Sequence, residues 1–194
     1  MFRVFLALFY TCGLVLAQET AEVTAAESVA LDFLEARGAW DSEALLVTLA
    51  DELDSRDIAA TKDDYADALK YYETINWNWT ADSCEQKNPG NVSTSVSCKA
   101  QLENDWTRAL GIGPFNMVFD FHIDNESNQI IGVYPQWNRV FIQEGLQVFF
   151  AFLNENHPDD FETLFGSGQH FLPRGEEKLV LLRQRTDEFA AAQR

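Results

Sequence analysis

Two cysteines on either side of a turn constrain the fold of this chain more than any other feature. Cys84 and Cys98 flank the segment Asn88-Pro89-Gly90-Asn91, which is a strong turn signal. Two antiparallel strands that leave this turn bring the cysteines opposite each other, so we predict a disulfide between them. Closing a loop of this size should stabilise the fold by about 3 kcal/mol. A metal site would need more ligands at Cys and His spacing, and a redox pair is more often Cys-x-x-Cys.

The first residues indicate an export signal. Arg3 supplies a positive charge, Val4 to Leu16 is mostly apolar, and Val15-Leu16-Ala17 fits a small-residue cleavage pattern. We expect residues 1–17 to be a signal peptide that is removed from the mature chain. An uncleaved anchor or a helix lying on the membrane is the alternative. Cys12 would leave with the signal, and the remaining cysteine pair fits a secreted protein or the lumen of the secretory pathway.

Three Asn-x-Ser/Thr triplets, which are acceptor sites for N-glycosylation, also indicate the secretory pathway. They begin at Asn78, Asn91 and Asn125, and none has proline in the middle. If an asparagine carries a sugar, its side chain must face water. The residues around Asn78 alternate between apolar and polar, which is the period of a strand. If Asn78 faces water, then Trp77 and Trp79 face the interior, where they are either core or the wall of a ligand pocket.

The composition excludes some classes of partner. The formal net charge is −17 and there is no basic patch, so a nucleic acid or an anionic membrane surface would be repelled. We interpret the charge as a means of keeping the chain soluble. The hydrophobic share of 46% indicates a substantial core rather than a disordered acidic chain. We see no internal repeat and no linker, so we expect one domain over residues 18–194.

The order of the predicted elements is helices, then strands, then helices, which is typical of an α+β fold. The clearest strand covers residues 115–124, where Phe119, Phe121 and three further apolar residues alternate with polar ones. The predicted helices cover residues 29–38, 41–49, 61–72, 141–153 and 175–193, with a short one starting at Pro158, and the predicted strands cover residues 74–83 and 92–103 and two segments of 111–137 joined at 124–128.

Two segments resemble a known family. VALDFLEARGAWDSEALLVTLADEL is similar to the opening helices of nuclear transport factor 2-like proteins, which include the SnoaL-like polyketide cyclases, and ALGIGPFNMVFDFHIDNESNQIIGVY is similar to their long strand, turn and following strand. The resemblance covers about residues 26–138. It implies a cone, in which a curved antiparallel sheet wraps around the N-terminal helices and encloses an apolar pocket. Residues from about 139 onward would form an additional C-terminal helical extension.

The resemblance leaves catalysis open. Catalytic members of the family use a pocket Asp with a Tyr or His beside it, and non-catalytic members exist as well, so the fold does not assign a function. Asp120, His122 and Tyr72 are the catalytic candidates here. Because Asp120 and His122 share a strand face opposite to the phenylalanines, we expect them to face solvent or a subunit contact. Further carboxylates that could reach a pocket are those of Asp32, Asp82 and Glu103.

We therefore expect a secreted protein with an apolar pocket that binds a small hydrophobic ligand, with no assigned catalysis. The expected pocket residues are Tyr72, Trp77, Trp79, Phe119 and Phe121. An enzyme of the isomerase, dehydratase or cyclase type is one alternative, and an interaction protein whose pocket is filled by its own side chains is another. The sequence also leaves open whether the chain forms a homodimer. The histidines are too far apart for a metal site, no phosphate-binding loop is present, and no cofactor is expected.

Overall fold

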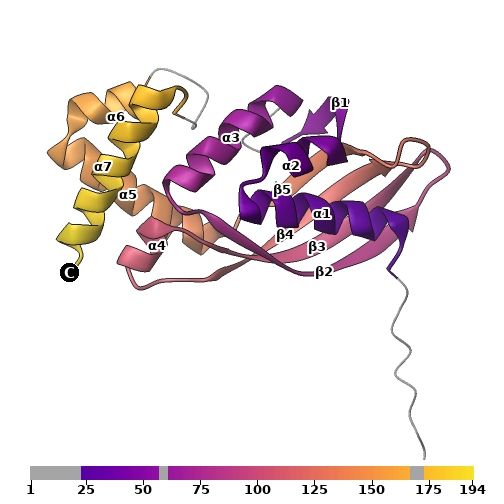
Figure 1. Ribbon diagram of the computed structural model, residues 1–194. Coiled ribbons are helices and arrows are strands. Elements are labelled where there is room, and N and C mark those ends of the chain that lie inside the picture. Colours follow the sequence, from indigo (N-terminus) through magenta and orange to yellow (C-terminus); the bar gives the residue numbers. More distant parts are fainter. Residues whose placement is uncertain (1–22, 57–60, 167–172) are drawn as a thin grey trace, which may run out of the picture.

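The computed structural model describes residues 23–56, 61–166 and 173–194. The signal peptide expected over residues 1–17 lies outside the described residues. Within them, the sheet has five strands in the order β1-β5-β4-β3-β2, and helices lie on one face and at one end of it (Figure 1). The predicted α+β class is confirmed, as is a curved sheet around the N-terminal helices. The strands are β1 (Leu49–Ser55), β2 (Asn78–Pro89), β3 (Ser93–Glu103), β4 (Phe115–Asp124) and β5 (Ile130–Gln136).

Helix α1 (Ala25–Ala39) packs on β2 and β3. It begins with a capping box, in which Thr24 and Glu27 each accept a hydrogen bond from the other's backbone N–H. We predicted its end at Gly38, but the helix continues to Ala39, and Trp40 takes the left-handed cap conformation. Gly38 serves another purpose. A Cβ there would lie 2.4 Å from the carbonyl oxygen of Trp79, so only glycine lets α1 approach β2 this closely.

The next segment corrects our prediction. Asp41, where the predicted helix begins, is the N-cap of α2 (Ser42–Thr48), but Leu49 is not part of that helix. It opens β1, which runs parallel to β5. The sheet is therefore mixed rather than purely antiparallel. Helix α3 (Lys62–Thr74) follows with a capping box between Thr61 and Asp64.

The cysteine hairpin forms as predicted. Cys84 and Cys98 are directly paired across β2 and β3, and their sulfur atoms are bonded. The strand β2 starts later than predicted and runs to Pro89, while Trp77 precedes it. On β3 and β4 the buried residues, which are mostly apolar, alternate with half-buried or exposed ones and face the helices. This inner face carries the core of the molecule, to which β4 contributes Phe115, Met117, Phe119, Phe121 and Ile123.

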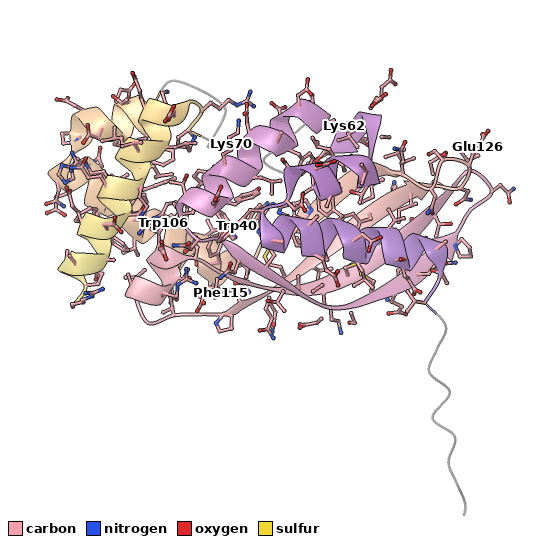
Figure 2. The ribbon with its side chains drawn as sticks, viewed as in Figure 1. Trp40, Lys62, Lys70, Trp106, Phe115 and Glu126 are labelled. Atoms are coloured by element: carbon pink, nitrogen blue, oxygen red, sulfur yellow. A yellow bond between two sulfur atoms is a disulfide. The ribbon has the colours of Figure 1, made fainter. Side chains whose placement is uncertain are left out.

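The C-terminal helices gather at the end of the sheet near α4 (Asp105–Ala109), opposite the hairpin tips (Figure 1). Figure 2 labels Trp106 at that end and Glu126 at the other. The Trp106 ring stacks on Phe149 at 4.2 Å, and its Nε1 donates to Thr186 at 3.0 Å, both inside the molecule. The extension comprises η1 (Phe141–Leu146), α5 (Gln147–Asn156), α6 (Pro158–Phe165) and α7 (Glu176–Ala192).

Our single predicted helix over residues 141–153 is thus two elements. Its first six residues, η1, have π-helical geometry, and α5 continues from Gln147. Gly145 lies where η1 meets α4, and a Cβ there would be 3.1 Å from the Thr107 Cγ2 atom. None of the described helices combines the length and the apolar character that crossing a bilayer requires.

Candidate ligand site

The side chains of Trp77 and Trp79 lie inside the molecule. They are 3% and 5% exposed, and their rings are stacked with centroids 5.8 Å apart and planes 10° from parallel. Asn78, between them, is exposed on the other side. The inward direction of Trp77 and Trp79, predicted from the alternation of apolar and polar residues, is therefore confirmed. Trp77 is placed by the turn after α3 and Trp79 by β2, so the pair marks the point where helix and sheet meet.

Rings from three other elements and from the segment after β5 surround this pair. Tyr72 of α3 lies 5.2 Å from Trp77, and Phe119 of β4 lies 5.1 Å from Trp79. Trp137, just after β5, contacts both indoles, and Phe141 of η1 lies 5.4 Å from Trp77. We call these six side chains the indole cluster: Tyr72, Trp77, Trp79, Phe119, Trp137 and Phe141. Phe121 lies behind Phe119, stacked on it at 6.0 Å, and contacts Phe33.

The sequence placed Trp77, Trp79, Tyr72, Phe119 and Phe121 in one site, and the structure brings these rings together. Trp137 and Phe141 were not expected there. Their contribution depends on how the chain after β5 folds back, and no local pattern indicates that. Phe141 is the first residue of η1, so the C-terminal extension contributes a ring to the indole cluster rather than standing apart from it.

A buried arginine borders the cluster. Arg37 of α1 is 0% exposed, and its guanidinium carbon lies 4.5 Å from the Trp79 ring and 4.7 Å from the Tyr72 ring. Its Nη2 donates to the Tyr72 hydroxyl at 2.6 Å. Burial of a charge is costly unless it is compensated, and aromatic faces and charge-assisted hydrogen bonds both compensate it. We had not singled out Arg37, although its helical spacing from buried Phe33 indicates the inner face.

Two N–H groups in the cluster have no acceptor. The indole Nε1 atoms of Trp77 and Trp79 are buried and make no hydrogen bond to any of the residues that the structure describes. Two other indoles behave differently. Trp106 donates to Thr186, and Trp40 donates to the carbonyl oxygen of Trp77 at 3.2 Å. A buried N–H group without a partner costs about 1–3 kcal/mol, so two in one cluster need an explanation.

The carboxylate and imidazole candidates lie elsewhere. Asp120 and His122 are on the outer face of β4, away from the indole cluster. The Asp120 Oδ2 accepts from the Gln136 side chain at 2.7 Å, and the His122 ring lies 5.0 Å from that of Tyr134. The structure therefore does not bring Asp120 or His122 together with buried Tyr72.

Tyr134 and Asp54 form a second hydrogen-bonded pair on that outer face, beside the pair of Asp120 and Gln136. The Tyr134 hydroxyl donates to the Asp54 Oδ2 atom at 2.8 Å. Partial burial, together with this carboxylate, raises the pKa of the Tyr134 hydroxyl above its ordinary value. Of the remaining carboxylates that we considered, Asp32 and Asp82 are exposed, and Glu103 pairs with Arg108 at 2.9 Å.

The three glycosylation triplets all lie on the surface. Asn78, Asn91 and Asn125 are exposed. Asn125 differs from the others because its side chain is engaged. Its Nδ2 donates to the Gly90 carbonyl oxygen and its Oδ1 accepts from Thr94, both at 2.8 Å, so it joins the two hairpin tips.

A cleft of about 430 Å³ lies between α3 and the start of α7. Its lining includes the charged residues Asp67, Lys70, Glu73, Arg174 and Glu176. Lys70 is paired with Asp67, and Arg174 is paired with Asp64. This cleft is lined by mixed charges and does not suit an apolar molecule. Over the residues that the structure describes, no three His, Cys, Asp or Glu side chains are grouped as a metal site would require.

No protein-family model matches the chain, and no curated protein matches its sequence. Solved structures are similar over part of it. An uncharacterised cystatin-fold protein from Novosphingobium aromaticivorans has 12% identity and a TM-score of 0.46, covering 60% of this chain and 100% of its own. A candidate polyketide cyclase from Pseudomonas putida has 14% identity and a TM-score of 0.46, covering 63% and 98%. A candidate ketosteroid isomerase from Kribbella flavida has 13% identity and a TM-score of 0.44, covering 59% and 78%.

Proposed function

We propose that this chain binds a small, apolar, ring-bearing molecule at the indole cluster. The observation that carries the proposal is the pair of buried indole N–H groups, on Trp77 and Trp79, that have no acceptor. A core that serves stability alone pairs its buried donors, as Trp106 does with Thr186. Stacked aromatic walls with a few unpaired polar groups are the usual lining of a site for a small molecule.

The ligand would enter at the seam between the sheet and η1. Trp137 is only partly buried, and Phe141 of η1 packs against it at 6.2 Å. Both rings contact Trp77, so moving them apart exposes the stacked pair. A π-helical turn is a rare feature that often occurs at functional sites, which is consistent with η1 closing this one.

The resemblance to nuclear transport factor 2-like proteins agrees with this proposal, because a curved sheet around helices encloses an apolar interior in that family. No carboxylate among those weighed above lies in the indole cluster, so binding without catalysis is the function we propose. We also propose that the chain is exported, since the leader pattern, the cysteine pair and the exposed triplets at Asn78 and Asn91 all suit the secretory pathway.

Fluorescence titration of the full chain with acetonaphthone tests the binding proposal. We expect saturable quenching of tryptophan emission, with affinity about tenfold lower in Trp79→Phe, which keeps a ring but removes the N–H donor. Trp106→Phe is the matched control, because it removes an indole outside the cluster, and its affinity should equal that of the wild type. Absence of saturable binding, or equal affinities in all three proteins, would contradict the proposal.

A further inference from the structure

We infer that the ligand presents a hydrogen-bond acceptor oxygen, a carbonyl or a carboxylate, to the indoles of Trp77 and Trp79. This inference rests on the proposed function and adds the chemical class of the ligand. It selects against molecules whose polar end is an amine or an ammonium group.

The first step is the direction of the missing hydrogen bonds. An indole Nε1 is a donor only, so the partner that Trp77 and Trp79 lack must be an acceptor. What both stacked indoles lack is therefore an acceptor, not a donor.

The second step is that two oxygen acceptors belonging to residues of the indole cluster already accept hydrogen bonds. The carbonyl oxygen of Trp77 accepts from the Trp40 Nε1 at 3.2 Å. The Tyr72 hydroxyl oxygen accepts from the Arg37 Nη2 at 2.6 Å. A ligand that brought another donor would have to compete for these two oxygens. A ligand oxygen would instead accept from the unpaired indole N–H groups of Trp77 and Trp79.

The third step is the nature of the neighbouring charged group. The guanidinium of Arg37 lies 4.5 Å from the Trp79 ring. Whatever else Arg37 contacts, its nitrogens are all donors, and it presents no acceptor to an ammonium ion. Indole faces alone would favour a cation, but here one face of Trp79 is already occupied by the guanidinium.

Four ligands with one ring system test the inference: naphthalene, acetonaphthone, naphthoate and naphthylmethylammonium. Each is titrated into the full wild-type chain with tryptophan emission as the readout. We expect acetonaphthone or naphthoate to bind at least about tenfold more tightly than naphthalene, and the ammonium compound to bind most weakly. The comparison of the ketone with the acid tells which oxygen is preferred.

The outcomes separate the two proposals. Equal affinity for all four compounds, or tightest binding of the ammonium compound, overturns the acceptor inference while the binding function stands. Binding of none of them overturns both. Trp79→Phe should reduce the preference for acetonaphthone over naphthalene, whereas Trp106→Phe should retain it. A preference that is unchanged in Trp79→Phe and in Trp77→Phe would also overturn the inference.

Discussion

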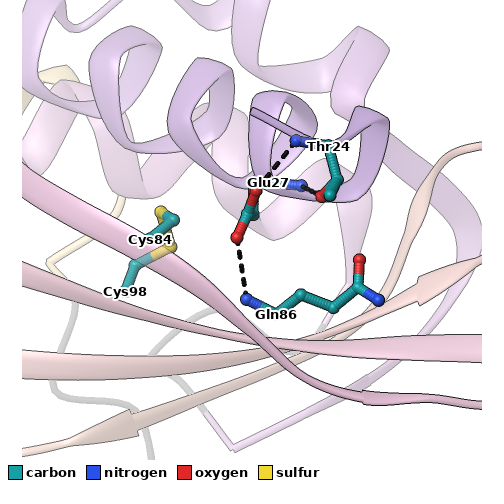
Figure 3. Close-up of a disulfide and its surroundings, with 5 residues drawn as sticks. All are labelled: Thr24, Glu27, Cys84, Gln86 and Cys98. Carbon is teal, nitrogen blue, oxygen red and sulfur yellow. Dashed lines mark hydrogen bonds between the residues drawn. A yellow bond between two sulfur atoms is a disulfide. The ribbon is translucent and has the colours of Figure 1, made fainter. Parts of the chain in front are cut away.

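Glu27 of α1 and Gln86 of β2 are joined by a hydrogen bond of 2.9 Å, in which the backbone N–H of Gln86 donates to the Glu27 Oε1 atom (Figure 3). The other carboxylate oxygen accepts from the backbone N–H of Thr24 at 2.8 Å. One side chain therefore caps a helix and also satisfies a donor of β2, the strand at one edge of the sheet. Edge strands carry unpaired N–H groups that other chains can pair with, so this contact also protects the edge.

Replacing Glu27 by Ala should lower the free energy of unfolding by about 1–2 kcal/mol, because both backbone donors lose their acceptor. The hydrogen bond from Thr24, followed by that from Gln86, holds the pKa of Glu27 below its ordinary value of 4.5. A lowered pKa means that the contribution is complete above that ordinary value and is lost as the pH falls through the folded-state value. Urea titrations at neutral and acidic pH check this.

The difference between wild type and Glu27→Gln should therefore narrow in acid. Glu43→Gln is the control, since Glu43 is an exposed glutamate in the first turn of α2. A difference that stays constant down to strongly acidic pH would show that the Glu27 charge does not stabilise the fold.

Tyr72→Phe should destabilise the protein more than Tyr65→Phe. Both tyrosines are on α3 and both are fully buried. The Tyr72 hydroxyl accepts from a charged group, Arg37, whereas the Tyr65 hydroxyl shares a neutral hydrogen bond of 3.2 Å with Ser55. We expect about 1.5–3 kcal/mol for the first and about 1 kcal/mol for the second, by thermal or chemical unfolding. The reverse order would mean that Arg37 does not depend on this hydroxyl.

Asp105→Asn should loosen the contact between α7 and the rest of the molecule. The Asp105 carboxylate accepts from Arg183 at 2.5 Å and from Asn76 and Arg108 at 2.8 Å each. Partial burial disfavours its charge, but these hydrogen bonds outweigh the burial and lower its pKa. We expect a loss of about 2 kcal/mol at neutral pH that shrinks as the pH falls through the lowered pKa.

Asp187→Asn is the matched control for Asp105. Asp187 also pairs with Arg183, but its side chain is 62% exposed, against 16% for Asp105. An exposed pair contributes less than about 1 kcal/mol. Hydrogen exchange of α7 amides, measured beside global unfolding, should show faster exchange in Asp105→Asn only. Equal exchange in both variants would assign the docking of α7 to its apolar contacts alone.

Asn125→Ala should destabilise the hairpin tips by about 2 kcal/mol, because the Gly90 carbonyl and the Thr94 hydroxyl each lose a partner. Asn91→Ala changes another exposed asparagine of the same tips and should stay within about 0.5 kcal/mol of wild type. Both variants also remove a glycosylation triplet, so unglycosylated protein is used for the comparison. Equal effects would mean that the Asn125 side chain does not hold the tips together.

The parts of the fold that the sequence predicted well are those with a local pattern. The period of two along β4 indicated which of its residues face the core, and the turn between the cysteines indicated the β2–β3 pairing. The strand β1 was missed because Asp51, Glu52 and Asp54 break any apolar alternation. It is a strand because it pairs with β5, which lies far along the chain. Residues close to β1 in the sequence do not indicate that pairing.

Arg37 shows why the site was only partly predictable. A basic residue at the end of a helix is usually explained by the helix dipole and placed in water. Here the same residue lies on the buried stripe of α1, among aromatic rings supplied by α3, β2 and β4. Its spacing from Phe33 was visible, but the rings that make burial of a charge tolerable come from distant segments. The same holds for Phe141, which reaches Trp77 only after the chain has turned back at η1.

The near-parallel stacking of Trp77 and Trp79 has a spectroscopic consequence. Two indoles held face to face at this separation couple their electronic transitions, so the far-ultraviolet circular dichroism of the native protein should contain a paired positive and negative band that neither ring produces alone. That couplet depends on the relative orientation and separation of the two indole transition dipoles, so a molecule that binds against the rings and shifts them will change it. Circular dichroism of the native protein would therefore report ligand binding at Trp77 and Trp79, without relying on emission intensity or on an attached label.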